Sequence, residues 1–176
     1  MRYRRALTPG ATYFFTVNLA ERSSRLLVDR VGDLREVVRR VRQQHPFEIV
    51  AWVVMPDHIH AIWQLPESDA AYSTRWALIK AGFSRAIPKT ERIRESRERK
   101  GERGIWQRRF WEHLIRDDKD LQRHVDYTHY NPVKHGYVRN AVDWPFSSMH
   151  RYVRLGWVAS DWGCSDDSDG DFGERG

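Results

Sequence analysis

The chain has little of what a secreted or membrane-spanning protein needs. Its single cysteine, Cys164, excludes an internal disulfide and is typical of a reducing compartment. No apolar run approaches the ~20 residues that span a bilayer. The opening Met-Arg-Tyr-Arg-Arg is not followed by the apolar segment of a secretory signal. We therefore expect a cytoplasmic protein that has no membrane partner.

Charge is unevenly distributed along the chain. Residues 161–176 hold six acidic side chains and one basic one, whereas residues 1–160 hold 29 basic and 18 acidic side chains, a net charge of +11. We interpret residues 1–160 as one folded domain and residues 161–176 as an acidic, disordered tail. Such a basic domain favours a polyanionic partner, because each neutralised phosphate releases counterions. The alternative is surface charge that only keeps the protein soluble.

The spacing of apolar residues predicts strands alternating with helices. We expect strands over 12–19, 47–55, 58–65 and 105–115, and helices over 26–44, 73–87, 118–131 and 148–153. Ser73 or Thr74 is the expected N-cap of the second helix. Asp117-Asp118 should cap the third helix, which Pro132 should end, and a serine of Trp144-Pro-Phe-Ser-Ser148 should cap the last one. This order indicates an α+β domain, an antiparallel β-sheet with helices on one face.

Two histidines occupy alternate positions in an apolar, β-branched run. Residues two apart on a strand point to the same side, so His58 and His60 should project together, about 6.6 Å apart along the backbone. Two such imidazoles can bind one divalent ion. The alternative is a pair of histidines on a half-exposed strand face.

A second motif places a phenol and an amide on one helix. Tyr127 and Asn131 lie four residues apart, hence on one helix face. Imidazole and amide oxygen ligands with open positions suit Mg²⁺ or Mn²⁺, and a nearby tyrosine can attack a metal-bound phosphate. The alternatives are that Tyr127 is a packed core aromatic and that Asn131-Pro132 only stops the helix.

Four sequence motifs resemble a known family. Trp52-Val-Val-Met-Pro-Asp-His-Ile-His60 resembles the HUH motif (His, hydrophobic, His) of single-tyrosine transposases. Together with Trp106-Gln-Arg-Arg-Phe-Trp-Glu-His113, Asp126-Tyr-Thr-His-Tyr-Asn-Pro-Val-Lys-His-Gly136 and Asp143-Trp-Pro-Phe-Ser-Ser148, it is similar to the REP-associated tyrosine transposases of bacteria (REP, repetitive extragenic palindrome). The resemblance extends from about Tyr3 to Trp162.

The resemblance implies a ferredoxin-like fold and a metal-dependent DNA strand transferase of the HUH endonuclease class. His58 and His60 match the metal ligands of the family, Tyr127 matches its nucleophile, and Asn131 occupies the position of an amide ligand. Tyr130 is a competing phenol, but on a helix it would face about 100° away from Asn131. The implied cofactor is Mg²⁺ or Mn²⁺, and the implied product is a 5′-phosphotyrosine linkage.

The implied partner is single-stranded or hairpin DNA of the REP type, bound by a monomer or a homodimer near the nucleoid. Candidate DNA-binding residues are basic or aromatic and lie in two stretches: Arg2, Tyr3, Arg4, Arg5, Arg108 and Arg109. Two other functions compete with strand transfer. One is a metal-dependent nuclease that uses water, and the other is a non-catalytic module that binds palindromic DNA or RNA.

Overall fold

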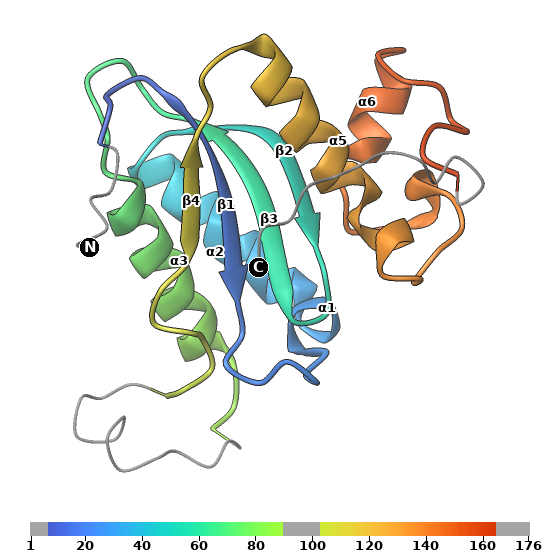
Figure 1. Cartoon of the computed structure of the whole chain (residues 1–176). Helices are drawn as coiled ribbons and strands as arrows, with labels where there is room; N and C mark the ends of the chain where they lie inside the picture. Colours follow the sequence, from blue (N-terminus) through green and yellow to red (C-terminus); the bar gives the residue numbers. More distant parts are fainter. Residues whose placement is uncertain (1–6, 90–102, 165–176) are drawn as a thin grey trace, which may run out of the picture.

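The computed structural model describes residues 7–89 and 103–164, which form one sheet with helices on both sides (Figure 1). The elements follow the chain in the order β1 (Thr12–Asn18), α1 (Leu26–Asp29), α2 (Val31–Gln44), β2 (Glu48–Val54), β3 (His58–Gln64), α3 (Tyr72–Ala86), β4 (Trp111–Leu114), α5 (Asp118–Lys134), the 3₁₀ turn η1 (Ala141–Asp143) and α6 (Met149–Arg154). Within these residues, no helix is both long and apolar enough to cross a membrane.

The sheet has the strand order β2-β3-β1-β4, and every neighbouring pair is antiparallel. Strand β3 is buried from His58 to Trp63 because it lies inside the sheet between β2 and β1. The predicted hairpin of β2 and β3 forms around Pro56-Asp57, and β1 pairs with β3 from Thr12↔Gln64 to Asn18↔His58. These observations confirm the predicted α+β class with a ferredoxin-like antiparallel sheet.

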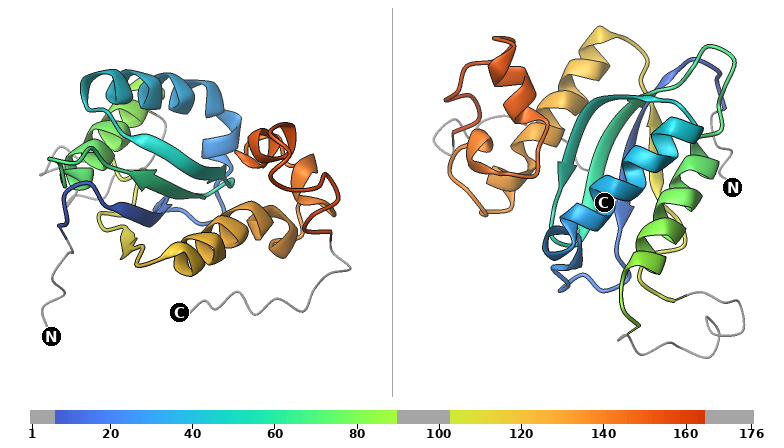
Figure 2. Two further views of the ribbon diagram at one scale, coloured as in Figure 1. Left: turned by 90° about the horizontal axis from the view of Figure 1, so that it is seen from above. Right: turned by 180° about the vertical axis from the view of Figure 1, so that it is seen from behind.

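One face of the sheet carries the main apolar core. Helices α2 and α3 cover this face (Figure 2), and alternate side chains of β1, such as Phe15, point into it. The indoles of Trp63 and Trp76 stack at 4.3 Å between β3 and α3. This is the helical layer that the sequence predicted.

Helix α5 lies against the opposite face and adds a second layer (Figure 2). Phe14 of β1 and Ile62 of β3 are buried there against Val125 of α5. Because strand residues alternate between faces, His58 and His60 point to this side together with Ile62. The helix therefore crosses the face that bears the two histidines.

Pro132 does not end α5, contrary to the prediction. The helix continues to Lys134, and its end is set by Gly136, which has a φ of 70°. The Gly136 N–H donates to the Val133 carbonyl at 2.9 Å and the Tyr137 N–H to the Pro132 carbonyl at 3.0 Å, the two bonds of a Schellman ending. Pro132 removes one backbone donor near the C-terminus of the helix without breaking it.

Other element boundaries also differ from those predicted. The single helix expected over 26–44 is divided at Arg30, whose backbone has a φ of −119°. Strand β4 is only four residues long, and the stretch before it contributes one isolated bridge, Leu19↔Trp106.

The expected N-caps have mixed outcomes. Asp117 caps α5 as predicted, accepting from the Asp120 N–H at 2.8 Å. Helix α3 instead begins at Tyr72 without a side-chain cap, so neither expected residue caps it. At the start of α6 the Ser147 hydroxyl accepts from the Met149 N–H at 3.1 Å, whereas the Ser148 hydroxyl accepts from the Trp52 N–H at 2.8 Å. Residues 165–176, most of the predicted tail, lie outside the described residues.

The close contact of α2 with α3 generates a stability prediction. A Cβ added to Gly82 would lie 2.7 Å from Cγ1 of Val37, a buried and stiff side chain, whereas a Cβ on Gly32 meets nothing within 4 Å. Gly32→Ala, in the first turn of α2, should raise the free energy of unfolding by up to about 1 kcal/mol through helix propensity. Gly82→Ala should have a free energy of unfolding about 1–3 kcal/mol below that of Gly32→Ala, because its new methyl group overpacks the contact with Val37.

Urea denaturation of the two variants measures this difference. An equal gain in both proteins would show that α2 and α3 are not packed as closely as the structure indicates.

Candidate active site

His58 and His60 face the space between the sheet and α5, as their alternation on β3 predicts. Both side chains are buried, and their ring centroids are 4.8 Å apart with the ring planes at 75°. Antiparallel pairing places them opposite Asn18 and Thr16 of β1. The central position of β3 in the sheet therefore holds both imidazoles inside the protein.

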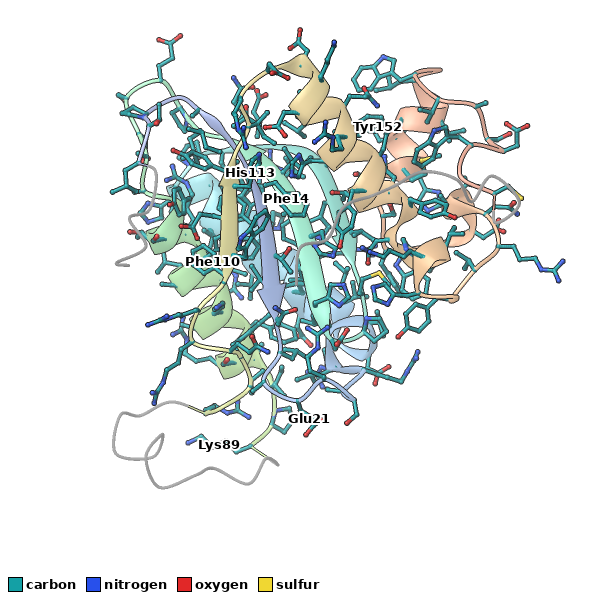
Figure 3. All side chains as sticks on the ribbon, in the orientation of Figure 1. Phe14, Glu21, Lys89, Phe110, His113 and Tyr152 are labelled. Atoms are coloured by element: carbon teal, nitrogen blue, oxygen red, sulfur yellow. The ribbon has the colours of Figure 1, made fainter. Side chains whose placement is uncertain are left out.

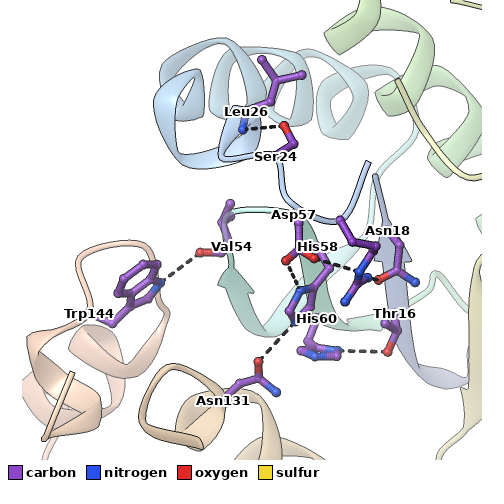
Figure 4. Close-up of polar contacts among 11 residues, drawn as sticks. Thr16, Asn18, Ser24, Leu26, Val54, Asp57, His58, His60, Asn131 and Trp144 are labelled. Carbon is purple, nitrogen blue, oxygen red and sulfur yellow. Dashed lines mark hydrogen bonds and ion pairs between the residues drawn. The ribbon is translucent and has the colours of Figure 1, made fainter. Parts of the chain in front are cut away.

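Each imidazole is oriented through its Nδ1 atom (Figure 4). His58 Nδ1 lies 2.7 Å from Asp57 Oδ1, and His60 Nδ1 lies 2.9 Å from Thr16 Oγ1. A carboxylate only accepts, so His58 donates to Asp57 from Nδ1. Second contacts of this kind are typical of metal-binding histidines.

The charges around the pair keep Asp57 ionised and His60 neutral. Burial would raise the pKa of Asp57, but the hydrogen bond and charge of His58 and the charge of Arg22, whose Nε is 2.9 Å away, lower it. Burial, and then the charges of His58 and His135, hold the pKa of His60 well below its usual range. A neutral imidazole is the form that binds a metal.

Asn131 completes a donor set of the composition expected for a divalent cation. Its side chain is fully buried, and its Oδ1 lies 3.3 Å from His58 Nε2. An imidazole nitrogen and an amide oxygen held this close together can both bind one divalent cation. Among the described residues, Asn131 Nδ2 has no hydrogen-bond partner. The residues present therefore fit a metal ion.

Tyr127 lies beside this group, one helical turn before Asn131. Its ring centroid is 5.0 Å from that of His60, and the Lys134 Nζ lies 5.1 Å above its face. Tyr130 faces elsewhere and packs with Val133 and Ala141. The structure thus brings together His58, His60, Tyr127 and Asn131, which are separated by up to 73 residues.

The predicted DNA-binding residues are placed only in part. Arg108 and Arg109 are exposed. They follow Gln107, whose N–H donates to the Asn18 carbonyl at 3.0 Å, and Asn18 pairs with His58. The backbone of the two arginines therefore lies close to the end of β1 that pairs with His58. Arg2, Tyr3, Arg4 and Arg5 lie outside the described residues.

A second group of metal-ligating residue types lies near the other end of the same face. The ligand atoms of His113, Asp120 and His124 are within 4.8 Å of one another. His113 Nε2 and the Arg116 N–H both bond Asp120 Oδ2, at 2.8 and 3.0 Å. The two imidazoles stack at 4.6 Å with planes 17° apart. The lone pairs of the two rings lie in these planes, so they point in nearly parallel directions and do not converge on one ion. We interpret this group as a hydrogen-bonded brace between β4 and α5.

Several partners of the site were not found by sequence reasoning. Thr16 is 44 residues from His60 and belongs to another strand, so only the sheet register reveals it. Asp57 could have been found from the sequence, because it directly precedes His58. Lys134 could also have been found, because it lies seven residues after Tyr127 and hence on the same helix face.

Comparisons with known proteins agree with this geometry. A family model described as "Transposase IS200 like" matches residues 11–131. A Haemophilus influenzae protein assigned as a REP-associated tyrosine transposase is 49% identical over 166 residues, which cover 94% of each chain. The REP-associated tyrosine transposase of Escherichia coli is 47% identical over 173 residues, or 98% of this chain and 96% of that protein.

The chain belongs to the REP-associated tyrosine transposases of the IS200-like family. A solved structure of a REP-associated tyrosine transposase bound to a REP hairpin is 47% identical, covers 99% of this chain and 98% of that one, and has a TM-score of 0.83. Metal dependence is a property of this transposase family, and the buried donor set described above fits it.

The part of this transposase beyond the family match covers the β2 edge of the sheet. The Ser148 N–H donates to the Trp52 carbonyl at 2.8 Å, and the Tyr152 hydroxyl donates to the Val50 carbonyl at 3.0 Å. The Arg151 guanidinium also donates to the Val50 carbonyl. These contacts satisfy backbone groups that an edge strand would otherwise expose.

His129 links α5 to this covering segment and generates a prediction on pH. Its Nε2 lies 2.8 Å from Ser148 Oγ, and burial, with the charge of Arg151, lowers its pKa to about 4. The folded state therefore takes up this proton at lower pH than the unfolded state. The contribution of neutral His129 to the free energy of unfolding is present above about pH 6.5 and is lost as the pH falls toward 4.

We expect the free energy of unfolding of the wild type to fall by about 3 kcal/mol more than that of His129→Gln between pH 7.5 and pH 4. Urea titrations of both proteins at the two pH values give this difference, and groups that titrate alike in both cancel. An equal loss in both proteins would contradict the buried, neutral state of His129.

Proposed function

We propose that this transposase cleaves and rejoins single-stranded DNA at REP-type hairpins through a covalent bond to Tyr127. The observation that carries the proposal is the meeting of Tyr127 with His58, His60 and Asn131 between the sheet and α5. The relative bound to a REP hairpin is 47% identical over nearly the whole chain, which supports the same class of substrate. The net charge of +11 over residues 1–160 suits a DNA partner.

The proposed step is an in-line displacement at phosphorus. The phenol oxygen of Tyr127 forms a bond to phosphorus, and the bond between phosphorus and the 3′ oxygen breaks. The products are a 5′-phosphotyrosine and a free 3′-hydroxyl. The phenol loses one proton and the 3′ oxygen gains one, so the step consumes no water. Because the phosphoester bond energy is retained, the 3′-hydroxyl of another strand can reverse the step and reseal the DNA.

His58, His60 and Asn131 would hold Mg²⁺ or Mn²⁺ in this proposal. When bound, the cation polarises a phosphate oxygen as a Lewis acid. The chain's own contribution is to orient the ligands: Asp57 and Thr16 hold the two imidazoles through their Nδ1 atoms, and α5 fixes Asn131 one turn from the nucleophile.

Lys134 adds a positive charge beside the nucleophile. Its ammonium group lies over the ring of Tyr127, and its charge contributes to lowering the pKa of His60. A cation in this position favours the approach of a phosphate to Tyr127. We place Lys134 among the residues that support the reaction.

Replacing Tyr127 distinguishes strand transfer from the competing functions. Tyr127→Phe should abolish the covalent DNA adduct, because it removes the only atom proposed to attack phosphorus. Tyr130→Phe is the matched control and should retain the adduct. The measurement is a denaturing gel of protein incubated with Mn²⁺ and a labelled REP hairpin that has single-stranded flanks.

Each competing function has its own outcome in that gel. Cleavage without an adduct, unchanged by Tyr127→Phe, would identify a nuclease that uses water. Binding without cleavage, insensitive to chelator and to His58→Ala, would identify a non-catalytic module.

Cation binding can be measured without catalysis. At 100 times its dissociation constant, a bound ion adds about 2.7 kcal/mol, which raises the melting temperature of a chain of this size by about 5 °C or more. Mn²⁺ should produce this shift in the wild type and not in His60→Ala. His113→Ala should keep the shift, because its imidazole belongs to the separate brace. A shift that is lost in His113→Ala and kept in His60→Ala would place the metal at His113, Asp120 and His124 instead.

A further inference from the structure

The motif Trp106–His113 contains side chains that the proposed reaction does not use. Along β4, alternate residues point to opposite faces of the sheet. Phe110, just before the strand, lies 6.0 Å from Phe15 on the core face. Trp111 and His113 point to the α5 side, where the Trp111 ring lies 5.7 Å from that of Phe14. Phe14 and His113 face each other across β1 and β4 (Figure 3).

Trp111 keeps half of its surface in water. Its exposure is 50%, and of the eight tryptophans only Trp157, at 63%, is also exposed. A half-exposed indole offers an apolar face on which a flat ring of another molecule can stack. The core does not require this orientation, since Phe110 and Trp106 already fill the apolar side.

The ring of Trp111 is held in a fixed orientation from behind. The His113 imidazole lies nearly parallel to it, at 9° and 5.8 Å, and His113 in turn stacks on His124. Asp120 accepts from His113 at 2.8 Å and anchors this row of rings to α5. An aromatic surface that is already ordered loses little conformational entropy when it binds.

The position of Trp111 relates it to the nucleophile. Phe14 contacts both, at 5.7 Å from Trp111 and 5.9 Å from Tyr127. A single ring therefore separates the exposed indole from the phenol. Arg108 and Arg109, both exposed, precede Trp111 in the chain with only Phe110 between them. A strand whose phosphate lies at Tyr127 would pass an aromatic ring and a pair of guanidinium groups.

We propose that Trp111 is a stacking platform for an unpaired base within one or two nucleotides of the cleaved phosphate. This inference rests on the proposed function and specifies how that site holds its DNA. An unpaired base is the favoured occupant because both of its faces are open to stacking, whereas a paired base is already stacked in its duplex. The neighbouring arginines complement the phosphates of such a strand.

The test is a double-mutant cycle between Trp111 and single bases of the DNA. The probe is a fluorescent REP hairpin with single-stranded flanks, in which each flanking nucleotide in turn is made abasic. Trp111→Ala should weaken binding about tenfold, as loss of one stacked base does, and Trp111→Phe should retain part of the affinity. One abasic position should weaken the wild type and leave Trp111→Ala unaffected. Trp157→Ala is the control and should bind like the wild type.

Two outcomes would overturn the proposal. One is that Trp111→Ala binds every probe like the wild type or responds to all abasic positions as the wild type does. The other is that Trp111→Ala changes the oligomeric state measured by light scattering and leaves DNA affinity unchanged, which would assign this face to a second copy of the chain. Failure of the proposed function is separate, because it is read from the covalent adduct of the wild type and its loss in Tyr127→Phe.

Discussion

The packing of α5 across the sheet is the contact on which the site depends. Tyr127, Asn131 and Lys134 belong to this helix, whereas His58 and His60 belong to β3. The burial of Phe14 and Ile62 against Val125 joins the two elements, and burying side chains of this size contributes about 1.5–3 kcal/mol each. If this contact opened, the nucleophile and the histidine pair would separate together.

The electrostatic design of the site follows from its burial. Two imidazoles and an amide are removed from water beside several positive charges, and His60 responds by remaining neutral. Asp57 supplies the negative charge that orients His58; the hydrogen bond and charge of His58, followed by the charge of Arg22, lower the pKa of that carboxyl group against the effect of burial. A divalent cation bound to His58, His60 and Asn131 would add its binding free energy to the stability of the fold, which links the stability of the site to its proposed function.

Local patterns predicted much of the fold and the composition of the site. The alternation in β3 placed both histidines on one face, the spacing of Tyr127 and Asn131 placed them on one helix, and Asp117 marked the start of that helix. The end of α5 could not be predicted in this way, because Pro132 is a strong local stop signal. The bonds that Gly136 and Tyr137 form with the last turn let the helix continue past it.

The features that were missed are those set by tertiary contacts. Thr16 reaches His60 only through strand register. Ser148 was one of two serines from which a helix cap was expected, but its hydroxyl joins the edge of β2 to His129. The face of the sheet that α5 covers also depends on long-range packing, and it decides whether the phenol meets the imidazoles.

An anomalous difference map from a crystal soaked in Mn²⁺ tests the central claim most directly, since it locates the ion without reference to activity. The account predicts one peak within bonding distance of Nε2 of His58, a nitrogen of His60 and Oδ1 of Asn131, on the side that Tyr127 faces. A peak at His113, Asp120 and His124 with none at the β3 pair would contradict it.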